Sequence, residues 1–249
     1  MNLGDRMKLR EHKTRIKVNA DEPVIVRLDG KAFHTWTKKI QCKKPFDISI
    51  TKAMQFAAIN TCREVGQVIV AYSQSDEITF LLNGWQKIES DVWFNGNVQK
   101  IASVFSSIFT VHFNMYMLKI FVADDLKLEN VIPAFFDARV FNIEREEIED
   151  VFVWRQRDAR RNSIQGVAQS LYSHKELQRK NTDDMKKMIL QKNVNWDELS
   201  NLQKWGFVVK KEVEEVEFMG DFVYRNKWIF DIEIPYFTED RDYLKNIIK

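Results

Sequence analysis

The sequence has few of the residues that mark metal-binding, disulfide-rich and disordered chains. Its 249 residues include two cysteines, Cys42 and Cys62, whose spacing fits neither a zinc site nor a disulfide framework. Four prolines and eight glycines are too few for a long low-complexity segment. No apolar run approaches the roughly 20 residues that span a bilayer, and the charged N-terminal residues do not resemble a signal peptide. We therefore expect a cytoplasmic protein with no membrane partner.

Charge is close to balanced over the whole chain, with a formal net charge of +2. Basic residues nevertheless cluster in residues 6–17, 38–44 and 155–161, and acidic residues cluster in 144–150. Local basic patches on a near-neutral protein suit a partner with a phosphate backbone. A solvated surface face is an equally good interpretation of any single cluster, so charge alone does not establish nucleic-acid binding.

The order of the predicted elements indicates an α+β fold. The first strand, residues 24–28, has an apolar face made of Val24, Val26 and Leu28. The first elements that follow are a polar loop (31–46) and a helix with Asp47 or Ser49 as its N-cap, which ends at Gly66. After them come a hairpin of two strands (67–72 and 77–82), a long helix (97–117) and a strand (135–141). This β-α-β-β-α-β order is typical of ferredoxin-like domains.

The second half of the chain adds helices and a small β-rich region. Helices are predicted over 146–173 and 176–190, and short strands over 207–211, 222–224 and 228–234. We expect a single domain over 1–249, with a catalytic core in 1–145 and an extension in 146–249. On the long helix of the core, the apolar stripe is expected to be buried rather than to form a subunit interface; it includes Phe105, Phe109 and Phe113.

Two carboxylates at strand ends are the strongest chemical signal. Asp29 ends the first strand and precedes Gly30, whose missing Cβ lets the backbone approach a ligand. Asp76 lies in the hairpin, which neighbours the first strand in a ferredoxin-like sheet. Two such carboxylates suit hard divalent cations, through which proteins handle triphosphates. An aspartate that caps a turn beside a glycine is an equally good interpretation of the spacing alone.

Two loop segments carry weaker signals of phosphate binding. The backbone N–H groups of Lys31–His34 are placed to cradle phosphates. His34 is a candidate general base, although a histidine in a loop is more often structural. Lys43–Asp47 adds cationic side chains and a carboxylate that could contact a base edge.

A basic helical segment is the remaining candidate. Arg157 and Arg161 share one helical face that could meet phosphates. The alternative is an exposed helix in which Asp158 pairs with these arginines. We expect Trp154 to be a core residue rather than a stacking platform.

Five segments of the chain resemble the tRNA-His guanylyltransferase family, and especially its guanylyltransferase-like branch. They occur in the family's order and cover roughly residues 6 to 175. The segments are Arg27–His34, Lys44–Asp47, Tyr72–Glu77, Phe136–Phe141 and Trp154–Asn162. The family adds nucleotides to the 5′ end of tRNA, against the direction of ordinary polymerases. Its catalytic domain is similar to a polymerase palm, which agrees with the predicted order of elements.

The resemblance also implies roles for individual residues. Asp29, the Gly30 carbonyl and Asp76 would bind two magnesium ions, and Glu77 would be a supporting carboxylate. Asp47 would contact the base of a bound nucleotide. ATP and GTP, or other nucleoside triphosphates, are the implied substrates. Residues that would hold the triphosphate are Lys31, Ala32, Phe33, His34, Lys44, Ser75, Lys100 and Asn162.

The sequence departs from the family at two places. Eukaryotic guanylyltransferases carry His-Ile-Asn-Asn where this chain has Arg160-Arg161-Asn162-Ser163. That motif is associated with guanylate addition to tRNA-His, so its loss implies the branch similar to template-dependent 5′-end repair enzymes. Asn97 stands where the family often has an arginine. Arg157 or Arg161 could supply the missing phosphate contact, and together with Arg160 they form the predicted RNA-binding set.

The implied function is magnesium-dependent, template-directed addition of nucleotides to a tRNA with an incomplete 5′ end, by a homotetramer. The 5′ end would be adenylylated by ATP or already triphosphorylated, and the 3′-hydroxyl of the incoming nucleotide would attack it. Dedicated guanylate addition to tRNA-His is the first alternative. A palm-fold nucleotide cyclase and a non-catalytic RNA-binding module are the others.

Overall fold

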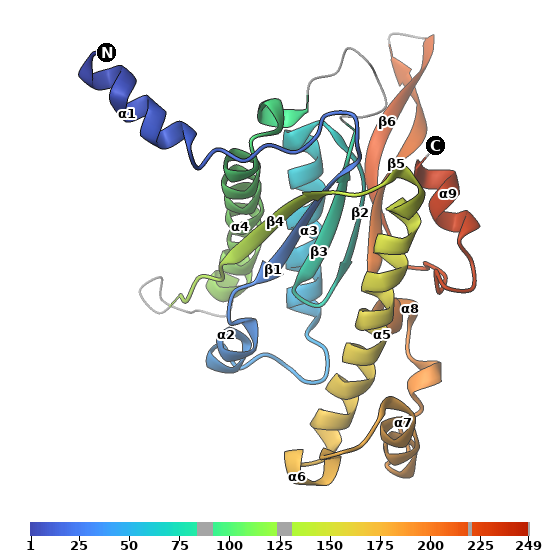
Figure 1. Cartoon of the computed structure of the whole chain (residues 1–249). Helices are drawn as coiled ribbons and strands as arrows, with labels where there is room; N and C mark the ends of the chain where they lie inside the picture. Colours follow the sequence, from blue (N-terminus) through green and yellow to red (C-terminus); the bar gives the residue numbers. More distant parts are fainter. Residues whose placement is uncertain (84–91, 124–130, 219–220, 249) are drawn as a thin grey trace.

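A six-stranded antiparallel sheet with strand order β4-β1-β3-β2-β5-β6 forms the centre of the fold (Figure 1). The computed structural model describes residues 1–83, 92–123, 131–218 and 221–248. The strands are β1 (Val24–Gly30), β2 (Val68–Gln74), β3 (Glu77–Leu82), β4 (Phe136–Asn142), β5 (Phe207–Phe218) and β6 (Asp221–Asp231).

Helices pack on both faces of this sheet. The helices of the described residues are α1 (Leu3–His12), α2 (Phe33–Lys39), α3 (Ile48–Val65), α4 (Val98–Ala123), α5 (Ile148–Leu171), α6 (His174–Leu177), α7 (Thr182–Gln191), α8 (Asn201–Trp205) and α9 (Asp242–Ile248), of which α1 has no buried residue. Short 3-10 helices lie at Trp93–Gly96, Arg145–Glu147 and Trp196–Glu198. The predicted β-α-β-β-α-β order is confirmed as β1-α3-β2-β3-α4-β4.

Helices α3 and α4 cover one face of the sheet, behind the strands in Figure 1. The predicted apolar face of β1 points toward them, and Val26 and Leu28 are fully buried there. From α4, Phe105, Phe109 and Phe113 pack into the same core. The prediction that this phenylalanine stripe is buried is therefore confirmed.

The other face of the sheet is only partly covered. Ile25 on β1 and Leu81 on β3 pack with Phe152 of α5 and Leu244 of α9. In Figure 1, α5 runs past the β2 side and leaves β1 and β4 open. The polar end of β1 lies on this open face, which positions the candidate site.

The segment predicted as a polar loop over 31–46 contains a helix. Phe33 and Trp36 are one turn apart and both buried, which gives α2 an apolar side to pack on the core. The loop prediction was wrong because this side consists of two aromatic residues among lysines and threonines.

The predicted small C-terminal β-region is part of the main sheet. Phe207–Val209 of β5 pair with Ala71–Ser73 of β2, so β5 and β6 extend the sheet instead of forming a separate unit. The two strands continue beyond this pairing as a long ribbon, where three short strands were predicted. Alternating charged residues obscured the length of β5, whose outer half is mostly solvated.

Helix α4, with 26 residues, is long and apolar enough to cross a membrane by length and composition alone. An apolar helix of this length differs from the expectation that no apolar run of the chain approaches the length of a bilayer span. Five of its side chains are buried against α3 and the sheet, so we interpret α4 as a core helix.

The helices that follow β4 begin with local capping. Four of them, including the 3-10 helix Arg145–Glu147 that precedes α5, start with a capping box, in which the N-cap residue and a residue three positions later bond to each other's backbone N–H groups. The boxes are Glu144/Glu147, Ser173/Glu176, Asn181/Asp184 and Ser200/Gln203. The box at Asn181 also explains why the helix predicted over 176–190 is divided into α6 and α7.

Candidate active site

Asp29 lies in a row of carboxylates at one end of the sheet. The register pairs Asp29 with Glu77 on β3 and with Asp137 on β4. Directly paired residues project from the same face, so all three side chains lie on the open face. Arg139 Nη1 lies 3.3 Å from Asp137 Oδ1 and 3.9 Å from Asp29 Oδ2. Asp29 therefore stands in an accessible ionic environment.

Asp76 lies against Gly30, as the predicted neighbourhood of strand and hairpin requires. The Gly30 N–H donates to the Asp76 main-chain carbonyl at 3.1 Å. A Cβ on Gly30 would lie 2.9 Å from Asp76 Oδ2, so a side chain there would press on the carboxylate. Ser75 has a φ of 57° in the turn, and its hydroxyl donates to Asp76 Oδ1 at 2.9 Å. The turn thus aims Asp76 at the end of β1.

Burial raises the pKa of Asp76 to about 6, against the opposing effect of the Ser75 hydrogen bond. The negative charges of Asp29 and Glu77 raise this pKa further. A cation bound at this place would favour the ionised form of Asp76. The carboxylates of Asp29 and Asp76, with the Gly30 carbonyl, supply the hard oxygen ligands that magnesium prefers. Within the described residues no cluster of three His, Cys, Asp or Glu side chains forms a closed metal site. Magnesium usually takes one or two carboxylates and completes its shell with water and substrate phosphates, so these residues fit it.

Glu77 is bound on both oxygens by one arginine. Arg155 Nε and Nη2 donate to Glu77 Oε1 and Oε2 at 2.5 and 2.8 Å, and Arg155 is buried. Arg155 Nη1 also pairs with Asp158 at 3.0 Å. Burial raises the pKa of Glu77, and Arg155 opposes that shift. The predicted catalytic role of Glu77 remains a prediction, and the geometry makes it a fixed neighbour of Asp29.

A cleft of about 710 Å³ opens beside Asp76, a size that suits a small-molecule ligand. It lies between α2, α3, the β2-β3 turn, α5 and α8. The structure brings seven of the predicted site residues to this cleft: Phe33, His34, Lys44, Asp47, Ser75, Asp76 and Asn162.

Several lining residues of the cleft were not predicted. Gln74, Gly166, Gln169 and Gln203 add small or amide side chains, and Met54 and Phe207 add apolar surface. Their positions depend on how α5 and α8 pack against the sheet. The local sequence carries no signal for that packing.

The predicted phosphate cradle is shorter than expected. The Lys31 N–H donates to the Phe135 carbonyl at 2.8 Å and is not free for a ligand. Ala32 is left-handed, with φ 49°, and starts α2. The N–H groups of Phe33 and His34 lie in the first turn of α2, where N–H groups have no acceptor within the helix.

Asp47 is the N-cap of α3, one of the two caps considered from the sequence. Its Oδ1 accepts the Ser49 N–H at 2.8 Å and its Oδ2 accepts the Lys43 N–H at 2.9 Å. The carboxylate thus orders the loop that carries Lys44 into the cleft. Contact with a base remains a prediction for Asp47.

Lys100 does not join this site within one chain. It begins α4, whereas Phe113, about 20 Å further along the helix by its rise per residue, packs on Phe33 of α2. Asn97 accepts the Lys100 N–H at 3.1 Å and is buried, so it supports the start of α4. This explains an asparagine at that position in terms of helix capping.

The arginines of α5 are only partly available. Arg161 pairs with Asp158 at 2.8 Å, which is the local pairing considered as the alternative. Arg157 Nε donates to the Thr238 hydroxyl at 3.2 Å, and Arg160 lies over the Trp196 ring. Their predicted RNA contacts remain predictions. Trp154 is 48% exposed, so its assignment to the core was wrong.

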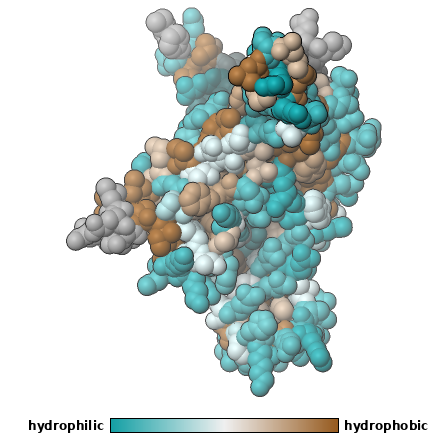
Figure 2. Space-filling model, turned by 60° about the vertical axis from the view of Figure 1, so that its left-hand side comes forward, coloured by the Kyte–Doolittle hydropathy of each residue, from teal (hydrophilic) through white to brown (hydrophobic). Residues whose placement is uncertain are grey.

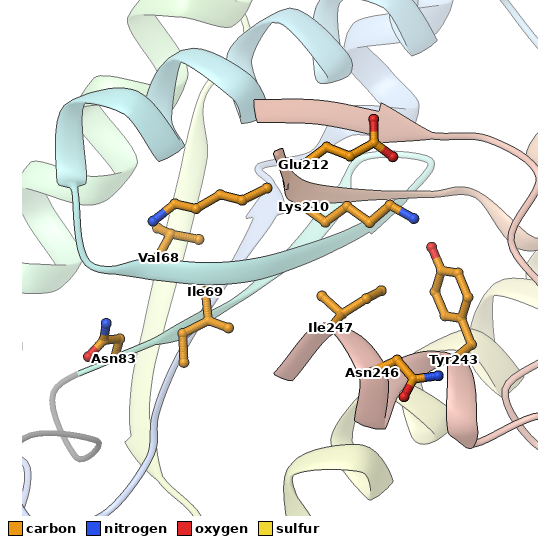
Figure 3. A pocket seen from close by; sticks show the side chains of 9 residues that line it. Val68, Ile69, Asn83, Lys210, Glu212, Tyr243, Asn246 and Ile247 are labelled. Carbon is orange, nitrogen blue, oxygen red and sulfur yellow. The ribbon is translucent and has the colours of Figure 1, made fainter. Parts of the chain in front are cut away.

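A second hollow of about 500 Å³ lies behind β5 and α9, and its lining includes Val68, Ile69 and Tyr243 (Figure 3). Of its two lysines, Lys210 pairs with Asp231 at 2.7 Å and Lys211 lies over the Trp228 ring. The Tyr243 hydroxyl donates to the Asp231 carboxylate at 2.8 Å. These groups satisfy one another, which distinguishes this hollow from the cleft at Asp76.

The profile of one protein family, described as tRNAHis guanylyltransferase, matches residues 4–144, more than half of the chain. The chain belongs to the tRNA(His) guanylyltransferase family. It is therefore a nucleotidyltransferase, and the matched residues include the carboxylates at Asp29 and Asp76. The resemblance inferred from the five sequence segments is confirmed.

Two solved structures of family members are similar over nearly their whole length. A bacterial tRNA(His) guanylyltransferase-like protein in complex with ATP is 37% identical, with a TM-score of 0.86, covering 100% of this chain and 99% of that chain. A bacterial guanylyltransferase-like protein in complex with GTP is 35% identical, with a TM-score of 0.82 and coverage of 99% and 98%. A probable tRNA(His) guanylyltransferase of Dictyostelium discoideum is 29% identical over 205 residues, 77% of each chain.

Proposed function

We propose that this family member is a magnesium-dependent enzyme that adds nucleotides to the 5′ end of a tRNA that lacks its first nucleotides, and that pairing with the opposite strand selects each nucleotide. The observation that carries the proposal is the convergence of Lys44, Ser75 and Asn162 on a cleft that ends at Asp76 and Gly30. The similar bacterial proteins in complex with ATP and GTP support nucleoside triphosphates as its ligands.

The residues of the site have two proposed roles, which are to bind the triphosphate and to hold the metal ions. Lys44 and Asn162 would hold the triphosphate in the cleft, and the first-turn N–H groups of α2 would bind one of its phosphates. Asp29, the Gly30 carbonyl and Asp76 would hold two magnesium ions, which neutralise triphosphate charge and acidify an attacking hydroxyl. Arg155 keeps Glu77 in place beside them. Rate acceleration then comes chiefly from positioning and charge neutralisation.

Template-directed repair is favoured over dedicated guanylate addition by the segment Arg160-Arg161-Asn162-Ser163. Arg160 lies over Trp196 and Ser163 donates to the Gln203 carbonyl, so two of these residues serve the packing of α5. Asn162 alone of the four lines the cleft as an exposed side chain. A palm-fold cyclase would use the same carboxylates with free ATP or GTP but would not need this segment. A non-catalytic RNA-binding module would not need the intact carboxylates.

The test uses a 5′-monophosphorylated tRNA transcript that lacks one 5′ nucleotide, with magnesium, ATP and each nucleoside triphosphate in turn. Addition of only the nucleotide complementary to the opposing base supports the proposal. Addition of guanylate whatever the opposing base supports the dedicated tRNA-His enzyme. Product formed without RNA indicates a cyclase, and magnesium-independent RNA binding without turnover indicates a binding module.

We also propose that the enzyme is a single-domain cytoplasmic homotetramer. The outer side of α4 supports an interface, because Val111, Met115 and Val122 are exposed along it. Figure 2 shows pale and brown residues on the side of the molecule that carries α4. Sedimentation of the purified protein, alone and as Met115→Lys, measures the assembly. A monomeric wild type at micromolar concentration would contradict it.

A further inference from the structure

Trp154 is exposed on α5, beside the part of the sheet that the helices leave open. Among the tryptophans that the structure describes, only Trp154 is exposed, whereas Trp36 and Trp196 are buried. It lies on α5, at the border between the covered and the open part of the sheet. A large aromatic side chain that stays accessible beside charged groups is suited to binding.

Two cations support the indole ring. The Arg155 guanidinium carbon lies 4.4 Å from the ring centroid, and that of Arg27 lies 5.3 Å from it. Arg155 is buried and bound to Glu77, and Arg27 is half-buried on β1. Among the described residues, Arg27 Nε has no hydrogen-bond partner. The indole thus has two guanidinium groups beside it, and Trp154 is still 48% exposed.

The ring stands close to the carboxylates but outside the cleft. Arg27 precedes Asp29 by two residues on β1, so both side chains project from the same face about 7 Å apart along the strand. Asp137 and Arg139 on β4 continue this open face, and each side chain is about half exposed. Trp154 does not line the cleft that ends at Asp76. Two ligands can therefore reach the carboxylates, one through the cleft and one over the open face.

We infer that Trp154 is a stacking platform for the terminal base at the 5′ end of the RNA substrate. The inference rests on the proposed function, which requires an RNA end beside Asp29 while a triphosphate fills the cleft. Aromatic side chains stack on the exposed π-face of a base with little sequence preference, because every base has such a face. That property suits template-directed addition, where pairing with the template, and not the protein, must select the base.

The experiment measures RNA binding and turnover with Trp154→Ala, Trp154→Phe and the control Tyr224→Ala. Tyr224 is exposed on the β5-β6 ribbon, away from the carboxylates. The RNA is a labelled tRNA transcript lacking its first nucleotide, with either a normal or an abasic residue at its 5′ end. We expect Trp154→Ala to raise the RNA Kd and KM about tenfold. The KM for the nucleoside triphosphate should stay within twofold, and Trp154→Phe and Tyr224→Ala should bind RNA within about threefold of wild type.

The abasic RNA separates stacking from a structural role. Removing the terminal base should weaken wild-type binding as much as Trp154→Ala does, and should weaken the variant no further. Equal sensitivity of wild type and Trp154→Ala to the abasic residue would overturn the inference, as would a higher KM for the triphosphate alone. Because binding is measured without nucleotide, this result is independent of turnover. If no nucleotide is ever added, the proposed function fails while the stacking test still gives an answer.

Discussion

Gly30 and Asp76 touch across the end of β1, where the Gly30 N–H donates to the Asp76 carbonyl at 3.1 Å. This contact joins the glycine of the first strand to the carboxylate of the hairpin. A Cβ on Gly30 would also lie 2.5 Å from Phe33 Cδ2. The end of β1, the β2-β3 hairpin and α2 are therefore packed too closely at Gly30 to accommodate a side chain.

Gly30→Ala should reduce nucleotide addition at least a hundredfold, because the new methyl group displaces Asp76 and Phe33 together. Overpacking of this kind costs about 1–3 kcal/mol of stability. The measurement is the rate of nucleotide addition together with urea unfolding. Gly4→Ala in α1 is the control, since Gly4 is exposed outside the cleft and its Cβ would meet only Asn2 Oδ1, at 3.3 Å. Equal activity of Gly30→Ala and wild type would contradict the close fit.

Asp29→Ala and Asp76→Ala should each be inactive yet folded, because each removes a carboxylate of the proposed magnesium site without opening the core. Activity should fall at least a thousandfold, and thermal unfolding without magnesium should stay within a few degrees of wild type. Magnesium should raise the Tm of the wild type but of neither variant. Retained nucleotide addition in either variant would refute the metal assignment.

Asp76 should make both activity and stability depend on pH around 6. Its pKa is raised to about 6, so the ionised form that binds a cation is lost below that pH, and activity should fall there. For an acid with a raised pKa, the stabilising protonated form is present at pH 4 and lost as the pH rises through 6.

The same pKa shift predicts that Asp76→Asn, which carries no charge, is more stable than wild type at pH 8 without magnesium. The expected gain is about 1–2 kcal/mol, discounted for the partial exposure of the site, and it should vanish below pH 4. Urea unfolding at the two pH values measures it. A constant difference would show that Asp76 has an ordinary pKa.

Arg155→Ala should destabilise the protein by about 3 kcal/mol, because it leaves Glu77 half-buried without its cation. Arg161→Ala removes an exposed partner of Asp158 and should cost less than about 1 kcal/mol. Urea unfolding of both variants provides the comparison. Similar losses in the free energy of unfolding for the two variants would mean that the buried Arg155–Glu77 pair stabilises the protein no more than the exposed Arg161–Asp158 pair.

The sequence predicted the elements whose pattern is local. Period-two alternation located β1, and the end of that strand placed Asp29 beside the hairpin of Asp76. The N-cap at Asp47 was also readable, since its carboxylate bonds residues nearby in the chain. These features need no knowledge of distant packing.

The missed features depend on distant packing. Trp154 has a large aromatic side chain, a type that is usually buried. It is exposed because the face of the sheet beside it, at β1 and β4, is only partly covered. The length of β5 was hidden because its outer half has only β6 as a partner. The far wall of the cleft, including Gly166 and Gln203, exists because α5 and α8 cross the end of the sheet.

The capping boxes between Glu144 and Gln203 have a consequence for the order of assembly. Helices that specify their own first turns, through contacts three residues apart, can form within microseconds. The pairs Asp29–Glu77 and Asp29–Asp137 join residues 48 and 108 positions apart in the chain. Contacts between residues so far apart in sequence form slowly, because a long loop must close first. During refolding of the complete chain, the helical wall of the cleft should therefore be present first. The enzyme would become competent only in the last folding step, when the edge strand β4 closes on β1.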